Sequence, residues 1–357
     1  MYRNLNTGVV EIDGKLTMEE AKEIARLSSI RTLQFTAALE WQSYHYINHI
    51  ILPACPDMTV RAYHFHGQVC DLAFVEQLPD LRSLAVLCQG EFVNLDCIAA
   101  LPQLQRLNVQ LHQLDSFDFL QQVNPQLSGL TLGQTASKKP SLQGIARFEQ
   151  LHELTVEGHR KQIEEIAQLT HLQKLSLRYL TLPDVNFLRQ LPELWWLQIY
   201  TGGTNELGAL AELKQLKYID LSQIRGLDQL DFLSSMTGLQ YIRIGAMPHI
   251  HELPALNQLK QLRKIELYNM KGLQRLDSLQ HPPALTEFIQ REAWEMEAEY
   301  YIPLLQNPAL QRAYVHLRNE KKFTRFRQLL EEHGKKNAAD EQSAGRTSWL
   351  TTDFPFE

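Results

Sequence analysis

Four histidines near the beginning of the chain have the spacing of possible metal ligands. His45 and His49 are four residues apart, so they would lie on one face of a helix. His64 and His66 alternate, as they would along one face of a strand. Imidazoles together with a carboxylate or a thiolate are typical zinc ligands, so these side chains could bind a metal ion if they met. The alternative is ordinary packed or surface histidine, because such spacings are common.

No familiar catalytic motif accompanies these histidines. The sequence contains no GxSxG, HExxH, GxxxxGK[ST] or CxxC pattern. We therefore predict no enzymatic activity and no cofactor, with a metal-dependent enzyme as the less favoured alternative. The cysteines show no disulfide-like regularity, which favours reduced thiols: Cys55, Cys70, Cys88 and Cys97.

The elements that would position any site are repeats, and they are clearest between Lys214 and Leu279. One pattern occurs three times there, as KQLKYIDLSQIRGLDQL, TGLQYIRIGAMPHIHEL and KQLRKIELYNMKGLQRL. The first leucines of the copies, Leu216, Leu239 and Leu262, are 23 residues apart. Each copy has the apolar order LxxLxL, followed by apolar residues at steps of three. This pattern predicts a short strand and a return path in every repeat.

The same register continues on both sides of these three copies. Matching leucines upstream are Leu194, Leu172, Leu151, Leu127, Leu104 and Leu81, and a first unit is predicted at Val60, Tyr63 and Phe65. Downstream, Leu285 opens a degenerate unit and Leu310 a weaker one. About eleven or twelve units of about 21 to 25 residues are predicted. Since each repeat packs only on its neighbours, such a chain can exceed the usual size of one globular domain.

These units resemble the leucine-rich-repeat family, in particular its short class with the pattern LxxLxLxxNxLxxL. The sequence departs from that pattern at the asparagine position, which is occupied by His112, Leu180, Ile224, Met247 and Met270. Apolar residues there indicate a turn packed against the core, as in the LxxLxLxxCxxL variant of plant resistance proteins. The resemblance implies an α/β repeat solenoid, an arc with a parallel concave sheet and short helical turns on the convex side. It also implies protein binding, without identifying the partner.

Strand residues between the core leucines point away from the core, so the repeats predict three columns of outward side chains. The first column is Lys174, Trp196, Tyr218, Tyr241, Lys264 and Glu287. The second is Ser176, Gln198, Asp220, Arg243, Glu266 and Ile289, and the third is Arg178, Tyr200, Ser222, Gly245, Tyr268 and Arg291. Because neighbouring parallel strands lie about 4.8 Å apart, each column forms a nearly continuous stripe.

Aromatic and charged residues concentrate in the later repeats, whereas early positions such as Gly129 and Thr131 are small or polar. Trp, Tyr and Arg are enriched at the energetic centres of interfaces. The predicted residues that bind a protein or peptide are Trp196, Tyr200, Tyr218, Asp220, Tyr241, Arg243, Lys264, Glu266 and Tyr268. The alternative is that the aromatic residues only shield the sheet and the charges satisfy one another.

The regions that flank the repeats are predicted to close their ends, because an end repeat would otherwise expose its core. The predicted parts are an N-terminal capping region at residues 1–57, leucine-rich repeats at 58–317, a C-terminal capping helix at 318–334 and a disordered tail at 335–357. Thr17 and Glu20 make a capping box before an amphipathic helix. The apolar residues Trp349, Leu350, Phe354 and Phe356 are unusual in such a tail and could dock on the body or on a partner.

Charge and hydropathy narrow the class of partner. The 357 residues include 35 basic and 41 acidic ones, for a net charge of -6. No basic excess favours nucleic acid, and no apolar run is long enough to favour a membrane span. The first residues lack the apolar core of a signal peptide. We therefore expect a cytoplasmic, non-enzymatic interaction module of undetermined oligomeric state. A sharper alternative is an inhibitor or immunity-type protein that blocks a toxin or an enzyme.

Overall fold

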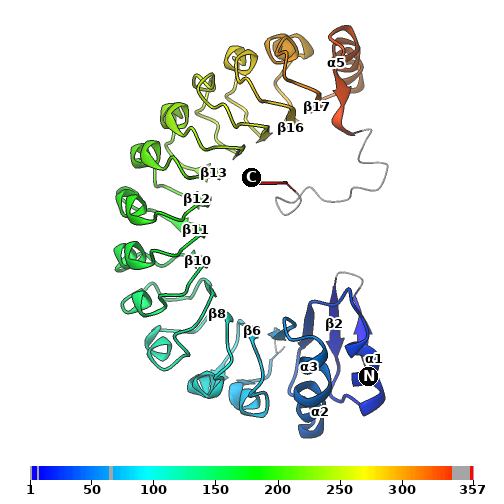
Figure 1. Cartoon of the computed structure of the whole chain (residues 1–357), viewed down its shortest axis with the longest axis vertical. Helices are drawn as coiled ribbons and strands as arrows, with labels where there is room; N and C mark the ends of the chain where they lie inside the picture. The colour runs from blue at the N-terminus through cyan, green and yellow to red at the C-terminus, as the bar shows by residue number, and fades with distance from the viewer. Residues whose placement is uncertain (1, 6–7, 64–66, 340–353, 357) are drawn as a thin grey trace. The chain divides into compact units, whose positions relative to one another are not determined.

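A computed structural model of the chain describes residues 2–5, 8–63, 67–339 and 354–356. The chain divides into two compact units, Met1–Leu172 and Gln173–Glu357, which we call unit 1 and unit 2. Within each unit, successive strands line one side and short helical turns line the other (Figure 1). The predicted α/β repeat solenoid is confirmed. Among the helices of the described residues, none has the length and apolar character that a bilayer crossing requires.

Unit 1 is built on a sheet with the strand order β1-β2-β3-β4-β6-β8-β9-β10. Its strands are β1 (Tyr2–Asn4), β2 (Val9–Ile12), β3 (Thr32–Phe35), β4 (Thr59–Tyr63), β6 (Ser83–Cys88), β8 (Arg106–Leu111), β9 (Gly129–Leu132) and β10 (Glu153–Glu157). The pair β1–β2 is antiparallel and the following pairs are parallel. A separate small pair joins β5 (Cys70–Asp71) to β7 (Phe92–Val93).

The return paths of unit 1 are short helical segments. The first ones are α1 (Met18–Ala25), α2 (Trp41–Tyr46), the π-helical η1 (Ile47–Ile51) and α3 (Leu52–Ala54). The later ones are 3-10 turns, η2 (Leu72–Gln77), η3 (Leu95–Ala100), η4 (Asp118–Gln121), η5 (Ile145–Arg147) and η6 (Ile163–Gln168). One or two turns of helix are all that fits between strands only about 23 residues apart.

The sheet of unit 1 continues into the region that the sequence predicts as a separate N-terminal cap. Val10 of β2, Leu33 of β3 and Val60 of β4 are successive partners in one register, and all three are buried. Strands β2 and β3 therefore extend the repeat-like sheet upstream of the predicted repeats. The helix α1 begins at the predicted capping box, where the Thr17 hydroxyl accepts from the Glu20 N–H and the Glu20 carboxylate accepts from the Thr17 N–H.

His159 is a buried histidine in unit 1. Its Nε2 lies 2.9 Å from the carbonyl oxygen of Gly133, and its ring packs edge-to-face on Phe117 at 4.8 Å. Burial lowers the pKa of His159 below the ordinary value, and the hydrogen bond to Gly133 only partly opposes this. The folded chain therefore favours the neutral imidazole.

This burial predicts a loss of stability as the pH falls. The unfolded chain, with its ordinary histidine pKa, takes up a proton below about pH 6.5, whereas folded His159 resists protonation. We expect His159→Gln to flatten the decrease of the free energy of unfolding between pH 7 and pH 5, by about 1.4 kcal/mol for each unit of pKa shift. Urea titrations at both pH values measure this. His112→Gln, at an exposed position, is the control; equal pH slopes for His159→Gln and wild type would contradict the assignment.

Unit 2 has the strand order β11-β12-β13-β14-β15-β16-β17-β18. Its strands are β11 (Lys174–Leu180), β12 (Trp196–Gly202), β13 (Tyr218–Ile224), β14 (Tyr241–Gly245), β15 (Lys264–Tyr268), β16 (Glu287–Ala293), β17 (Arg312–Leu317) and β18 (Lys336–Asn337). Its helical segments are η7 (Asn186–Gln190), η8 (Gly208–Glu212), η9 (Asp231–Ser235), η10 (Asp277–Gln280), η11 (Ala298–Tyr301), α4 (Ile302–Leu305) and α5 (Glu320–Glu332). All these strand pairs are parallel.

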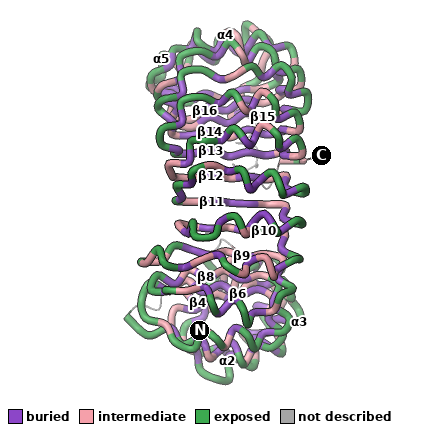
Figure 2. Tube along the Cα trace, turned by 90° about the vertical axis from the view of Figure 1, so that its left-hand side faces the viewer, coloured by how far each residue is buried: buried purple, intermediate pink, exposed green. Residues whose placement is uncertain are grey.

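The LxxLxL residues form the core of unit 2. In β12 and the residues just before it, Leu194, Leu197 and Ile199 are buried, while Trp196 and Gln198 between them point to the other face. Leu197 pairs with Ile219 of β13 in the same register, so the buried residues of successive repeats stack. The tube in Figure 2 shows the strands of unit 2 mostly buried between exposed turns.

The strands of unit 2 end in a recurrent left-handed residue. The positive φ angles occur at Tyr179, Thr201, Gln223, Ala246, Asn269 and Glu292. This conformation turns the chain so that the next residue points back to the core. The predicted apolar residues at the asparagine position are accordingly buried: Leu180, Ile224, Met247 and Met270. His112, the polar residue at this position, is exposed, because β8 alternates regularly and buries Leu111 instead.

The helix α5 lies within the range 318–334 that the sequence predicts as a capping helix. Asn319 caps it by accepting from the Lys322 N–H, and the helix buries Phe326, Leu329 and Leu330. The chain then adds β18 to β17. The apolar face of α5 therefore covers the last part of unit 2 that the structure describes continuously.

Candidate interaction surface

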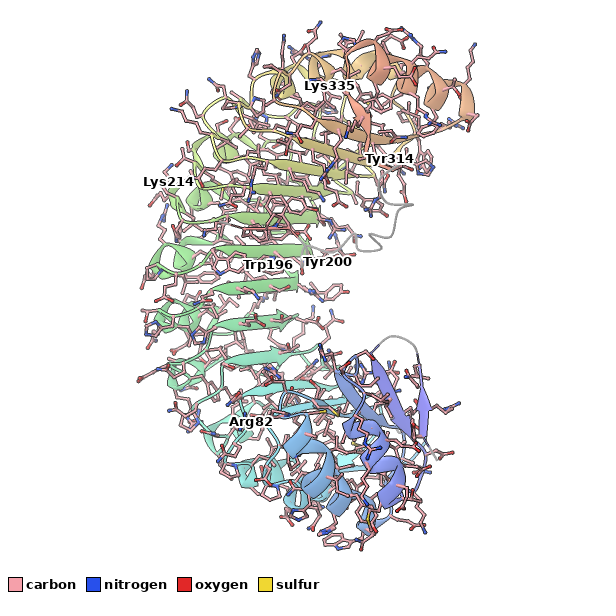
Figure 3. The ribbon with its side chains drawn as sticks, turned by 45° about the vertical axis from the view of Figure 1, so that its right-hand side comes forward. Arg82, Trp196, Tyr200, Lys214, Tyr314 and Lys335 are labelled. Carbon is pink, nitrogen blue, oxygen red and sulfur yellow. The ribbon has the colours of Figure 1, made fainter. Side chains whose placement is uncertain are left out.

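The three predicted columns are present on the strand side of unit 2. Lys174, Trp196, Tyr218, Tyr241, Lys264 and Glu287 are successive partners in one register, and the other two columns follow the same register. Figure 3 shows Trp196 and Tyr200 on the strand side and Lys214 on the side of the turns. The sequence therefore predicts correctly which of these residues are neighbours.

The first column contains a continuous row of rings, Trp196, Tyr218 and Tyr241, which we call the aromatic column. Trp196 and Tyr218 are stacked with centroids 5.2 Å apart and planes 19° apart. Tyr218 and Tyr241 meet edge-to-face at 5.1 Å. Lys264 continues the row, with its Nζ 4.9 Å from the centre of the Tyr241 ring and 2.9 Å from Glu287 Oε1. Four adjacent strands thus supply one extended surface.

Tyr218 and Tyr241 are far less exposed than an outward column suggests. Each is only 1% exposed, whereas Trp196 is half-buried. Burial raises the pKa of Tyr218 far above its ordinary range. Burial, and then the charge of Glu266, do the same to the pKa of Tyr241, whose hydroxyl donates to Glu266 Oε2 at 2.6 Å. Both phenols therefore remain protonated donors at any physiological pH.

The second column holds a charged group, Asp220, Arg243 and Glu266, which we call the charged column. Arg243 Nη1 donates to Asp220 Oδ2 at 3.2 Å, and its Nε lies 3.7 Å from Glu266 Oε1. Asp220 also accepts from Gln198 Nε2 and Ser222 Oγ, each at 2.8 Å. Burial opposes the charge of Arg243, but the charges of Asp220 and Glu266 raise its pKa overall. The two carboxylates are deeply buried and partnered.

The third column contributes two of the predicted residues at the border of this surface. The Tyr200 ring packs edge-to-face on Tyr179 at 6.2 Å, and its hydroxyl lies 3.3 Å from Gln223 Nε2, which donates to it. Tyr268 lies against Gly245, its partner in the register, where no side chain competes for the space. Neither ring has a described contact with the aromatic column. The structure therefore separates these tyrosines from Trp196, Tyr218 and Tyr241.

Two residues that the sequence reasoning missed complete the surface along one edge. Trp195 directly precedes β12 and Arg263 directly precedes β15, so they occupy the same position relative to their strands. Lys174 Nζ lies 5.6 Å from the centre of the Trp195 ring, and Arg263 donates to Gln240 Oε1 at 2.9 Å. The doublet Trp195-Trp196 was a signal in the sequence, because its first ring belongs to none of the three predicted columns. We call Trp195 and Arg263 the edge residues.

The register of these strands identifies the fold. Each strand from β11 to β16 pairs in parallel with the strand one repeat later, with the LxxLxL residues in the core and a short 3-10 turn or loop on the return path. The chain has the leucine-rich-repeat fold. This is the fold that the resemblance inferred from the sequence implies.

Several solved structures of leucine-rich-repeat proteins are similar to the chain. An internalin from Listeria monocytogenes has 15% identity, covering 87% of this chain and 87% of that chain, with a TM-score of 0.41. A leucine-rich-repeat protein of Leptospira interrogans has 18% identity, covering 90% and 92%, with a TM-score of 0.48. TLR13, in a TLR13–ssRNA13 complex, has 13% identity, covering 87% of this chain and 58% of that chain, with a TM-score of 0.43. No protein-family model and no curated protein matches.

The histidines considered as metal ligands come together only in part. The rings of His45 and His49 lie 4.3 Å apart on consecutive turns of α2 and η1. His64 and His66 lie outside the described residues. Within the part of the chain that the structure describes, no group of three or more His, Cys, Asp or Glu side chains is placed to hold a metal ion.

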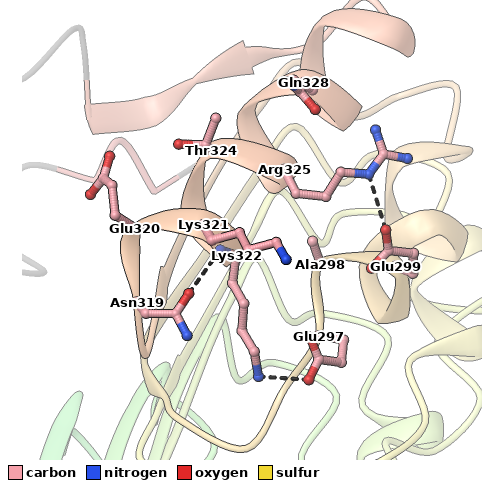
Figure 4. A pocket seen from close by; sticks show the side chains of 10 residues that line it. All are labelled: Glu297, Ala298, Glu299, Asn319, Glu320, Lys321, Lys322, Thr324, Arg325 and Gln328. Carbon is pink, nitrogen blue, oxygen red and sulfur yellow. Dashed lines mark hydrogen bonds and ion pairs between the residues drawn. The ribbon is translucent and has the colours of Figure 1, made fainter.

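Two hollows lie outside the aromatic column. One, of about 690 Å³, lies beside α5, where Lys322 Nζ is 2.6 Å from Glu297 Oε1 and Arg325 Nε is 3.0 Å from Glu299 Oε1 (Figure 4). These four charges are therefore paired with one another. The other, of about 230 Å³, lies on the strand face of unit 1 around small or polar residues such as Thr131. Neither offers the large apolar rings of unit 2.

Proposed function

We propose that this leucine-rich-repeat protein is a non-enzymatic interaction module, which binds a protein or peptide on the strand face of unit 2. The observation that supports this most is the row of rings across three adjacent strands, Trp196, Tyr218 and Tyr241, with Lys264 at its end. Large aromatic side chains dominate interface energetics because they remove much apolar surface from water and keep a polar end.

The charges beside the row favour a protein or peptide over a nucleic acid. Arg243 lies between two carboxylates, Asp220 and Glu266, so the surface carries both signs. A nucleic-acid site would need an uninterrupted basic stripe to meet successive phosphates. A peptide, in contrast, offers backbone donors and acceptors that suit alternating charges. Blocking of a toxin or an enzyme would be one consequence of such binding.

A cytoplasmic location fits the same proposal. Cys55, Cys70, Cys88 and Cys97 are free thiols, and reduced cysteines are typical of proteins kept in a reducing compartment. Fractionation of the native cell, followed by detection of the intact chain, measures this directly.

The proposal is tested by Trp196→Ala. Partners captured from the native cell by the wild-type chain would be purified, and their affinities for wild type and variant compared by calorimetry. We expect the variant to lose about 2 kcal/mol of binding free energy, roughly a 30-fold rise in Kd, because a large anchor ring is removed. Trp196 is chosen because it is half-buried, so its loss disturbs the core less than the loss of Tyr218.

Thr131→Ala is the matched control, because Thr131 occupies an outward strand position of unit 1. It is expected to leave affinity unchanged. Thermal unfolding of each variant checks that a loss of binding does not come from a loss of folding. The strand face of unit 2 would be the wrong surface if Trp196→Ala bound the partner like wild type while substitutions at residues 133–143, the polar segment after β9 of unit 1, abolished binding.

A further inference from the structure

A short segment distant in sequence lies on the aromatic column. Residues Phe354–Phe356, which we call the aromatic segment, contact side chains of β13 and β14 and both edge residues. Figures 1 and 2 both place the described end of the chain beside β13. The surface proposed to bind a partner is therefore already occupied by residues of the same unit.

Phe354 occupies one half of this contact. Its ring lies 5.2 Å from the Tyr241 ring, and the Arg263 guanidinium carbon lies 4.8 Å from the centre of the Phe354 ring. A guanidinium over an aromatic face is an attractive arrangement, and Arg263 is held in place by Gln240. The first position of the segment therefore requires a ring.

Phe356 occupies the other half. Its ring lies 5.2 Å from Trp195 and 6.1 Å from Tyr218, and it also packs on Phe354 at 4.8 Å. Trp195 belongs to none of the three columns, and its described ring contact is with Phe356. The two phenylalanines together lie over two tyrosines that are each only 1% exposed.

Pro355 sets the shape that brings both rings to the surface. The Phe356 N–H donates to the Phe354 carbonyl oxygen at 3.0 Å, which closes a three-residue turn around Pro355. The proline ring fixes φ near the value such a turn needs, so little entropy is lost on binding. The Pro355 carbonyl in turn accepts a hydrogen bond from Arg263 Nη2. The segment thus supplies two rings and one oriented acceptor, and each meets a complementary group.

We propose that the strand face of unit 2 is a recognition site for an aromatic–proline–aromatic peptide motif, which the chain's own Phe354-Pro355-Phe356 occupies. This inference rests on the proposed function, since it names the chemistry of the partner at the same surface. A partner with the same motif competes with the aromatic segment. Because the segment is covalently attached, it competes at an effective concentration that is commonly about millimolar. A partner must therefore bind tightly enough to displace the segment from the site.

The test uses the full chain and a labelled synthetic peptide, TTDFPFE, the sequence of residues 351–357. Fluorescence polarisation measures its binding to wild type and to the variant Phe354→Ala/Phe356→Ala. We expect the variant to bind the peptide at least tenfold more tightly than wild type, because its site is vacated. The peptide TTDAPAE is the control and is expected to bind neither protein.

A second substitution places the peptide on the proposed surface. Added to the variant, Trp195→Ala is expected to remove the gained affinity, because it deletes the ring under Phe356. Arg263→Met, which leaves the aromatic column intact, is expected to weaken binding at least fivefold by removing the donor to the Pro355 carbonyl. Both changes lie outside the repeat core, and thermal unfolding checks that each protein is folded.

Four results would overturn the inference. The first two are equal peptide binding by wild type and variant, and no peptide binding by the variant. The third is peptide binding that neither Trp195→Ala nor Arg263→Met weakens. The fourth is a wild-type dimer that becomes monomeric in the variant, because the segment would then lie on a second copy of the chain. The proposed function fails separately. If a captured partner depends on Trp196 but is not displaced by the peptide, the interaction surface stands and the motif does not.

Discussion

Gly202→Ala is expected to destabilise unit 2 by about 3 kcal/mol or more. A Cβ built on Gly202 would lie 1.8 Å from the carbonyl oxygen of Leu180 and 2.9 Å from its carbonyl carbon. Leu180 and Gly202 are partners in β11 and β12, and the Gly203 N–H donates to that same oxygen at 3.3 Å. Since the obstacle is backbone, no change of rotamer relieves it. The two strands would have to separate at their carboxyl ends.

Gly208→Ala is the matched control for this substitution. Gly208 lies in the same repeat, at the beginning of η8, and a Cβ there would meet nothing within 4 Å. Alanine at such a position is expected to be neutral or to stabilise by up to about 1 kcal/mol, because it restricts the unfolded chain. Urea-induced unfolding, followed by circular dichroism, compares both variants with wild type. Equal midpoints for the two variants would refute the close approach of β11 and β12.

In unit 2 the sequence predicts the neighbours on the strand face down to the single residue. In unit 1 the predicted first unit is wrong by three residues, because Val60 pairs with Leu84 and not with Leu81. Once Leu216, Leu239 and Leu262 are aligned, the parallel sheet leaves one register, so Tyr218 must lie beside Tyr241. A shift by one residue would have turned the leucines to the solvent. The repeats therefore determine this part of the site, because every copy has the same pattern of buried apolar residues and so fixes the same register.

The burial of these rings could not be predicted in the same way. The repeat register places Tyr218 and Tyr241 on the outward face, yet each is only 1% exposed, and Phe354 and Phe356, more than 100 residues further along the chain, lie against them. No periodicity connects these positions. The sequence could only indicate that phenylalanines in a polar stretch were unusual, and most of that predicted tail, including Trp349, lies outside the described residues.

The strands upstream of the repeats could not be predicted from the sequence for a different reason. Strands β2 and β3 have only four residues each, and the α-helices between the first strands replace the 3-10 turns of later repeats. The leucine spacing therefore does not recur at a fixed interval there. Leu33 and Phe35 echo the repeat, but two residues do not establish a register, whereas pairing with Val60 and Ala62 in the structure does.

Arg243→Met is expected to destabilise unit 2 by about 2 to 3 kcal/mol, although methionine keeps most of the packing. Arg243 is the cation between Asp220 and Glu266, whose side chains are 1% and 2% exposed. Removing one partner of a buried pair commonly costs about 3 to 5 kcal/mol, because a charge is left uncompensated. The expected cost is lower here for two reasons. The Arg243 side chain is 38% exposed, so water screens part of its charge, and Asp220 keeps two other donors.

A double-mutant cycle separates the charge from the packing. Asp220→Asn added to Arg243→Met removes the uncompensated charge, so the pair is expected to be less destabilised than the sum of the single variants. Arg275→Met is the control, because the ion pairs of Arg275 with Glu252 and Asp277 are formed by side chains at least 62% exposed, where such pairs contribute little. Equilibrium unfolding in urea gives each free energy. Additive effects of Arg243→Met and Asp220→Asn would contradict this expectation. They would mean that polar neighbours, and not the ion pairs, stabilise the charged column. Arg243 would then be available to bind a carboxylate of a partner.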